Sequence, residues 1–194
     1  MKKIAVLVSG GGTNLQALID AWKAGELGGG ELSLVISSVQ GAGALERAEK
    51  AGIKTLTIEK NGLTDNDFDI VLAETLNKHD IDLVVLAGFL CVLGKQVLIN
   101  FENKIINVHP SLIPSFCGKG YYGLRVHQAA LEYGVKVTGA TVHYVNEVID
   151  GGKKILQKAV DVLPDDTPEI LQQRVMREAE WIILPKAVAM LCSG

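Results

Sequence analysis

Short, continuous apolar runs recur along the first half of the chain, and segments with helical spacing lie between them. Ile4–Val8, Leu32–Ile36 and Leu83–Leu86 are rich in valine, isoleucine and leucine, as is typical of strands buried on both faces of a parallel sheet. The apolar positions of Leu15–Trp22 recur at near-helical spacing after the first run. Strands that alternate with helices predict an α/β fold with a doubly wound, mostly parallel, Rossmann-like sheet.

The pattern changes after Pro114, where a loop rich in glycine and aromatic residues precedes a helical stretch at Leu124–Tyr133. Thr138–Val145 then alternates between apolar and polar residues, and Ile155–Val162 has the composition of a returning strand. A turn joins the two without an intervening helix, so we expect an antiparallel hairpin at one side of the sheet.

Several residues mark the ends of predicted helices. Thr64 with Asp67 is typical of a capping pair, and Thr167 with Pro168 is typical of the start of a long final helix. Because a proline within a helix removes one backbone donor, we expect that final helix to be broken near Pro185.

Length and composition restrict the class of protein. The 194 residues suit one domain, and 48% hydrophobic with 21% charged residues indicates a globular chain. A net charge of −3 gives no basic field for nucleic acid. The three scattered cysteines and the lack of clustered Cys and His residues argue against a disulfide framework or a metal site. No apolar run approaches membrane-spanning length, so we expect a cytoplasmic protein without a membrane partner.

The strongest candidate for chemistry is the end of the apolar run Ile105–Val108. Asn107 and His109 stand two residues apart, so in a strand their side chains point to the same face, and Pro110 then ends the strand. An amide can stabilise an oxyanion and an imidazole can transfer a proton. The alternative interpretation is a polar turn that merely ends a strand.

Ser9–Asn14 is a glycine-rich loop between the first strand and the first helix. The backbone amides of such a loop form an anion site, which predicts binding of a phosphate monoester. The loop lacks the Gly-Lys-Ser/Thr of a nucleotide-binding P-loop, and Leu15 stands where a dinucleotide fingerprint has its third glycine. A turn that serves only close packing of helix on strand remains an equal alternative.

Asp150 lies in a turn beside two glycines, which is also ordinary turn chemistry. The functional hypothesis is that Asp150 pairs with His109 and raises the pKa of the imidazole. His143 either lines the same cleft or is satisfied within the sheet, and we favour the second. His127 is expected on the surface of a helix.

Four motifs occur in order along the chain: Ser-Gly-x-Gly-Thr-Asn-Leu-Gln-Ala, Val-Leu-Ala-Gly-Phe, Asn-x-His-Pro-Ser-Leu-Ile-Pro and Val-x-x-x-x-Asp-Gly-Gly. Together they resemble the phosphoribosylglycinamide formyltransferases over essentially the whole sequence. The resemblance implies transfer of the formyl group of 10-formyltetrahydrofolate to the amino group of glycinamide ribonucleotide in purine biosynthesis. It also implies one formyltransferase domain, with a phosphate-binding half at 1–100 and a folate-binding, catalytic half at 101–194.

The resemblance further assigns roles to individual residues, and it includes no metal ligand. The catalytic residues would be Asn107, His109 and Asp150. The residues that contact the ribonucleotide would be Gly12, Thr13, Asn14 and Glu180, and Glu178 is the alternative match for the last, depending on the register of the helix. The residues that bind the folate co-substrate would be Leu90, Cys91, Val92, Leu93, Asn107, Asn146 and Asp150.

Two alternatives remain open at the level of sequence. A hydrolase of formyltetrahydrofolate would use the same trio and transfer the formyl group to water, without need of the phosphate loop. A non-catalytic nucleotide-binding relative would keep the loop and turn nothing over. In every case the expected partners are small molecules, and we expect a monomer or a weak homodimer.

Overall fold

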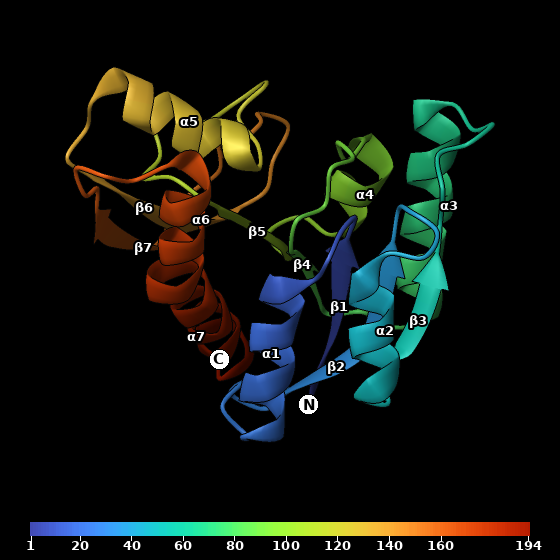
Figure 1. Ribbon diagram of the computed structural model, residues 1–194. Coiled ribbons are helices and arrows are strands. Elements are labelled where there is room, and N and C mark those ends of the chain that lie inside the picture. Colours follow the sequence, from blue (N-terminus) through green and yellow to red (C-terminus); the bar gives the residue numbers. More distant parts are fainter.

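Seven strands form one sheet in the order β3-β2-β1-β4-β5-β6-β7, in a computed structural model that describes all residues from 1 to 194 (Figure 1). β1 to β5 run parallel to one another, β6 is antiparallel to β5, and β7 is antiparallel to β6. The predicted doubly wound sheet with a C-terminal hairpin is therefore confirmed. The strands are β1 (Lys2–Val8), β2 (Gly30–Ser37), β3 (Lys54–Thr57), β4 (Leu83–Leu86), β5 (Ile105–His109), β6 (Val137–Tyr144) and β7 (Lys154–Asp161).

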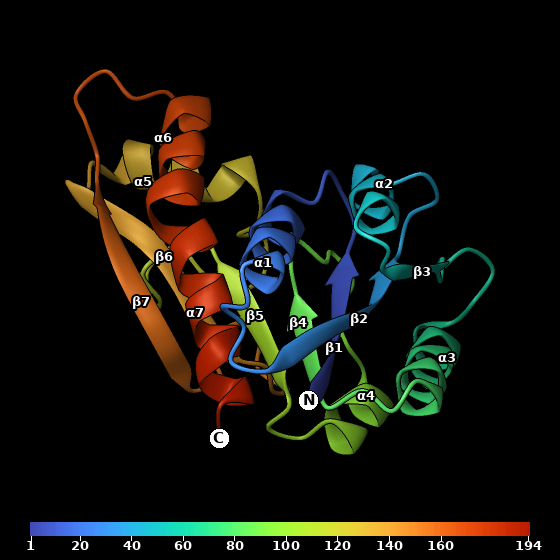
Figure 2. The same cartoon turned by 90° about the horizontal axis from the view of Figure 1, so that it is seen from below.

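Helices cover both faces of the sheet. Figure 2 shows α1 and α2 on one side and α3 and α4 on the other, while α6 and α7 extend along the side of α1. None of the helices combines the length and hydrophobicity that crossing a bilayer requires. The helices are α1 (Thr13–Lys23), α2 (Gly43–Lys50), α3 (Asp65–Lys78), α4 (Lys95–Asn100), α5 (Leu124–Tyr133), α6 (Pro168–Val175), a π-helical turn (Met176–Glu180) and α7 (Trp181–Cys192).

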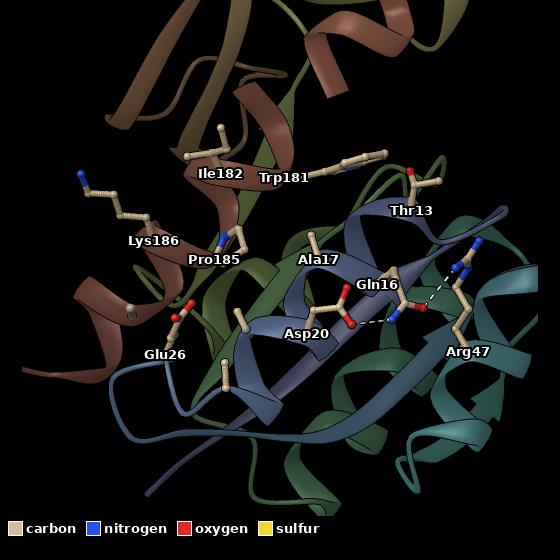
Figure 3. A pocket seen from close by; sticks show the side chains of 13 residues that line it. Thr13, Gln16, Ala17, Asp20, Glu26, Arg47, Trp181, Ile182, Pro185 and Lys186 are labelled. Atoms are coloured by element: carbon tan, nitrogen blue, oxygen red, sulfur yellow. Dashed lines mark hydrogen bonds between the residues drawn. The ribbon is translucent and has the colours of Figure 1, made fainter. Parts of the chain in front are cut away.

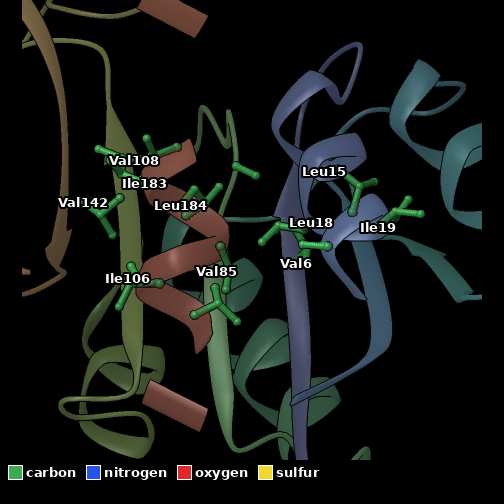
Figure 4. Close-up of a cluster of buried hydrophobic side chains, with 14 of the residues drawn as sticks. Val6, Leu15, Leu18, Ile19, Val85, Ile106, Val108, Val142, Ile183 and Leu184 are labelled. Atoms are coloured by element: carbon green, nitrogen blue, oxygen red, sulfur yellow. The ribbon is translucent and has the colours of Figure 1, made fainter. Parts of the chain in front are cut away.

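The core is divided by the sheet into two clusters, as the alternation of side chains along β1 requires. Ile4, Val6 and Val8 belong to a cluster with α1 and α7, part of which is drawn in Figure 4. Ala5 and Leu7 belong to a second cluster with α3 and α4. Burial on both faces explains why the parallel strands are continuous apolar runs in the sequence.

The predicted helix starts are confirmed, and the predicted break at Pro185 is wrong. The hydroxyl oxygens of Thr64 and Thr167 accept backbone N–H groups of the first turns of α3 and α6. α7 continues through Pro185, and the irregularity is the π-helical turn that ends at Glu180. A proline ring conflicts with the carbonyl four residues before it, here that of Trp181, so the helix deviates upstream of the proline.

The carboxyl ends of β1, β4 and β5 lie at one edge of the sheet, and the strand order reverses between β1 and β4. Ligands of open α/β sheets bind at such a point. Hydrogen bonds join the loops there: the Ser9 N–H donates to the Gly88 carbonyl at 3.0 Å, and the Leu90 N–H donates to Ser9 Oγ at 2.9 Å. The glycine-rich loop and the loop after β4 are thus held side by side.

Candidate active site

A cavity of about 530 Å³ opens at this edge of the sheet, and Asn107, His109 and Asp150 all line it. The first two leave β5 from the same face, as their spacing predicts, and Asp150 arrives from the turn between β6 and β7. His109 Nδ1 lies 3.7 Å from Asp150 Oδ2. The structure therefore brings Asp150 to the two side chains of β5, although it lies more than forty positions later in the sequence.

His143 also lines this cavity, contrary to our expectation that it is merely satisfied within the sheet. It stands opposite Asn107 in the β5–β6 pairing, with 3.3 Å between Asn107 Nδ2 and His143 Nε2. The same Nε2 lies 3.5 Å from Asp150 Oδ1. The sequence contains only a weak signal for this role, because the register that pairs these residues is set by the hairpin.

The turn that carries Asp150 is held in a particular shape. Asp150 adopts a left-handed backbone conformation with φ 56°, and Lys154 Nζ donates to the carbonyls of Asp150 and Gly152 at 3.2 and 2.9 Å. A Cβ on Gly152 would meet the Tyr144 carbonyl oxygen at 1.8 Å, so only glycine fits there. The Gly118 N–H donates to Asp150 Oδ2 at 2.8 Å, which fixes the carboxylate itself.

The electrostatics of the pair differ from the prediction that Asp150 raises the pKa of His109. Burial lowers the pKa of His109 below 6.5, and the attraction of Asp150 and the hydrogen bond to the Phe116 carbonyl do not offset it. Burial would also raise the pKa of Asp150, but hydrogen bonds from His143 and Gly118 hold it below its usual value. At neutral pH the free protein therefore carries a neutral imidazole beside a carboxylate.

His127 was expected on a helix surface, and it is buried instead, at 1% exposure on the inner side of α5. Neither ring nitrogen has a hydrogen-bond partner. Burial, with a smaller contribution from the charge of His109, lowers the pKa of His127 to about 4. Protonation of this side chain therefore destabilises the folded state.

We predict that His127 makes the protein sensitive to acid. Its pKa in the folded protein lies below 6.5, the value of an unperturbed histidine. The folded protein therefore keeps its full stability above pH 6.5 and loses stability as the pH falls toward 4. The free energy of unfolding should fall by up to about 3 kcal/mol over that range. In urea titrations His127→Leu should show a weaker pH dependence, whereas His79→Leu, at the end of α3, should not. Equal slopes for His127→Leu and wild type would contradict the prediction.

The glycine-rich loop packs tightly before α1. Gly12 has φ 76°, and a Cβ there would lie 2.7 Å from Cα and Cβ of Ala44 in α2. Close packing against α2 therefore requires glycine at position 12. The phosphate interpretation remains a prediction, which is compatible with the geometry because no side chain caps the first N–H groups of α1.

Asn14 and Glu180 form a buried pair at the start of α1. Asn14 Nδ2 donates to Glu180 Oε2 at 2.6 Å, and Asn14 Oδ1 has no partner. Burial raises the pKa of Glu180 to about 7, although the bond from Asn14 acts in the opposite direction. Gly12, Thr13, Asn14 and Glu180, which the resemblance groups as ribonucleotide contacts, do lie together in the fold.

The residues proposed for folate all line the cavity. Leu90, Cys91, Val92 and Leu93 follow β4 and line it, as does Asn146 in the turn that leads to Asp150. Leu90 and Val92 are 66% and 70% exposed, although both are large apolar residues. An apolar lip of this kind suits a flat hydrophobic ring.

A second cavity, of about 860 Å³, lies between α1 and α7 (Figure 3). Thr13 and Trp181 lie at one end of it, and Arg47 donates to the Gly11 carbonyl at 2.8 Å and to Gln16 Oε1 at 3.1 Å. It contains no histidine, and neither Asn107 nor Asp150 lines it. The histidine–carboxylate pair that the sequence predicts is therefore in the smaller cavity.

Comparison with known proteins agrees with this architecture. A model of the formyl transferase family matches residues 2–188. A phosphoribosylglycinamide formyltransferase of Haemophilus influenzae is 40% identical, and the match covers 100% of this chain and 89% of that protein. The crystal structure of glycinamide ribonucleotide transformylase 1 from Symbiobacterium toebii superposes with a TM-score of 0.94 at 42% identity, over 100% of this chain and 89% of that one.

Fold and site thus define a formyl transferase. Other relatives are longer: the chain is 42% identical to the trifunctional purine biosynthetic protein adenosine-3 of Drosophila melanogaster and of Gallus gallus, and spans 14% and 18% of their lengths. Because relatives of similar length match throughout, the chain belongs to the phosphoribosylglycinamide formyltransferase family.

Proposed function

We propose that this chain transfers the formyl group of 10-formyltetrahydrofolate to the amino group of glycinamide ribonucleotide. The products are N-formylglycinamide ribonucleotide and tetrahydrofolate. The observation that carries the proposal is the convergence of Asn107, His109 and Asp150 on one cavity, whose lining residue Leu90 is bonded to Ser9 of the loop before α1. The names of the relatives support the same reaction.

In the proposed mechanism the substrate amine attacks the formyl carbon, and negative charge develops on the formyl oxygen. Asn107 Nδ2 donates a hydrogen bond to that oxyanion. The neutral imidazole of His109 takes a proton from the attacking amine and returns it to the folate nitrogen as the bond from that nitrogen to the formyl carbon breaks. Asp150 stabilises the imidazolium that exists between these two proton transfers. This mechanism starts from a neutral His109, in agreement with the lowered pKa of that side chain.

The two substrates would approach from opposite sides. The lip Leu90–Leu93 and the turn Asn146–Asp150 would hold the folate ring, whose apolar faces match the exposed leucine and valine. The backbone of Gly12–Asn14 would hold the phosphate, with Glu180 in contact with the ribonucleotide. We thus assign phosphate binding to 1–100 and catalysis to 101–194 of one domain, with the lip reaching across from the first half.

We further expect small-molecule substrates only, with no nucleic-acid or membrane partner, in a cytoplasmic monomer or weak homodimer. An assay of tetrahydrofolate release with and without glycinamide ribonucleotide tests the proposal directly. Release that requires the ribonucleotide supports it. Release without the ribonucleotide would indicate the hydrolase, and no release at all would indicate the non-catalytic relative.

Gly12→Ala should weaken the ribonucleotide site. The added Cβ conflicts with Ala44, so the loop must move away from the start of α1. We expect KM for glycinamide ribonucleotide to rise roughly tenfold, which corresponds to about 1.4 kcal/mol of binding, with a smaller change for a dephosphorylated analogue.

Gly25→Ala is the matched control for this prediction. Gly25 has a similar φ of 75° at the other end of α1, but a Cβ there meets nothing within 4 Å. It reproduces the backbone strain without the displacement of the loop, so KM should not change. Equal losses for the substrate and its dephosphorylated analogue in Gly12→Ala would contradict a phosphate site at this loop.

A further inference from the structure

Phe116 stands out in the loop between β5 and α5 because its backbone is left-handed, with φ 48°. A bulky residue rarely adopts this conformation, and glycine or asparagine usually takes such positions. Strain of this kind persists only where the surroundings hold it, and it concentrates at functional sites. Phe116 lies seven residues after His109, in a part of the chain to which the motifs assign no role.

Aromatic contacts and a neighbouring hydrogen bond hold this loop. The ring of Phe116 packs edge-on against Tyr133 of α5 with 5.9 Å between centroids, and is tilted against Tyr121 at 6.4 Å. Ser111 Oγ donates to the carbonyl of Ser115 at 2.5 Å. Tyr133 is 81% exposed, so its contact with Phe116 is made at the surface and not in the core.

The consequence of this conformation is the direction of one carbonyl group. The Phe116 carbonyl oxygen lies 2.9 Å from His109 Nε2. A carbonyl oxygen can only accept, so Nε2 must carry the hydrogen. In neutral His109 the lone pair is then on Nδ1, the nitrogen that lies 3.7 Å from Asp150 Oδ2.

We propose that Phe116 is a positioning residue that holds His109 in the Nε2–H tautomer and so makes Nδ1 the nitrogen that takes the proton of the attacking amine. The tautomer follows from this contact alone, and the use of Nδ1 rests on the proposed function. The proton moves from the amine to Nδ1, where Asp150 faces it, and then to the departing folate nitrogen, while Nε2–H stays on the Phe116 carbonyl throughout. His109 thus returns to its starting tautomer after each turnover.

The other groups near His109 do not offer Nε2 an alternative hydrogen-bond acceptor. Asp150 faces Nδ1, and His143 is bonded to the Tyr144 carbonyl through Nδ1 and lies near Asp150 through Nε2. The side chain of His127 makes no hydrogen bond to any group of the protein. The Phe116 carbonyl is the one acceptor that contacts His109 Nε2.

The test is the tautomer of His109 in the full-length protein, read from nitrogen-15 spectra of labelled histidine at about pH 8, well above the ordinary histidine pKa. The chain has four histidines, so His109→Ala identifies the signal. Wild type should show the Nε2–H tautomer. Phe116→Ala loses the ring contacts that hold the left-handed backbone, so the signal should move toward a mixture of tautomers and kcat should fall roughly ten- to hundredfold, with folate affinity little changed.

Three further variants separate positioning from folding. Phe116→Tyr keeps the ring and should restore both the tautomer and kcat. Tyr133→Ala removes the packing partner without altering the loop itself, so it should shift the tautomer in the same direction even if Phe116→Ala fails to fold. Gln128→Ala, on the exposed side of α5 where Gln128 bonds only Glu132, should change neither quantity.

Some outcomes would overturn the proposal. A pure Nε2–H spectrum in both Phe116→Ala and Tyr133→Ala would exclude positioning by this contact, and so would a loss of kcat without any change of tautomer. If wild type transferred no formyl group while Phe116→Ala still changed the tautomer, the positioning of His109 would be supported and the proposed function would be wrong.

Discussion

Replacing His109 with alanine is expected to lower kcat by about 10²–10⁴-fold, while folate still binds. The imidazole is the one proton-transfer group of the cavity that faces Asp150 through Nδ1 and is fixed by a backbone carbonyl through Nε2. Its loss removes the base to which the mechanism assigns the proton of the attacking amine. The measurement is single-turnover formyl transfer at saturating substrates, with folate affinity determined separately.

The pH dependence of wild type gives the same assignment a second test. Burial lowers the pKa of His109 below 6.5, and the neutral form is the one that accepts a proton. Because kcat/KM for the folate co-substrate at saturating ribonucleotide reports the protein before folate binds, it should fall as pH drops through that lowered pKa, and the titration of Glu180 near 7 is kept out of the measurement by the bound ribonucleotide. A kcat/KM that declined as pH rose through neutrality would show that the protonated imidazole is the active form.

His79→Ala is the matched control for His109→Ala. His79 lies at the end of α3, where its Nδ1 is 2.8 Å from the Thr75 carbonyl, and it does not line the cavity. Its replacement should leave kcat unchanged. Normal turnover in His109→Ala would remove this histidine from the mechanism.

Asn107→Ala is expected to lower kcat by about 10²–10³-fold, as does the loss of one oxyanion donor in other acyl-transfer enzymes. The amide is half-buried in β5 and lines the cavity, and its Nδ2 lies 3.3 Å from His143 Nε2 in the free protein. Because the charge on the formyl oxygen exists only in the transition state, kcat should fall with little change in KM.

Asn107→Asp sharpens this prediction, because it keeps the size of the side chain but replaces the donor with a negative charge. We expect it to be at least as slow as Asn107→Ala, since the carboxylate would repel the oxyanion. Asn77→Ala serves as the control, because Asn77 bonds only Asn100 across α3 and α4, on the surface. Activity in Asn107→Asp above that of Asn107→Ala would contradict a role as donor.

Asp150 and Phe116, both left-handed non-glycine residues, belong to one arrangement. Asp150 is held by Lys154 from one side and by the Gly118 N–H from the other, and Phe116 lies two residues before Gly118. The loop after β5 therefore binds both members of the pair, His109 through a carbonyl and Asp150 through an amide. A displacement of this loop would change the base and its carboxylate partner together.

Much of the fold could be predicted because its signals are local. Burial on both faces produces the apolar runs of the parallel strands, and the residues at Thr64 and Thr167 cap helices through bonds that span only three positions. The same holds for Asn107 and His109, whose common direction follows from strand geometry alone. The grouping of the site residues, by contrast, came from the resemblance of the motifs and not from spacing.

The tertiary structure alone decided how the site is completed and charged. His143 reaches Asp150 because of the register between β5 and β6, His127 is buried because α5 turns that face inward, and the carbonyl of Phe116 reaches His109 across a loop. Whether the pKa of His109 is raised or lowered depends on how its burial compares with the attraction of one carboxylate. That balance cannot be predicted from the spacing of residues in the sequence. Local periodicity determines which residues form strands and helices, whereas desolvation and long-range contacts exist only once those elements have packed.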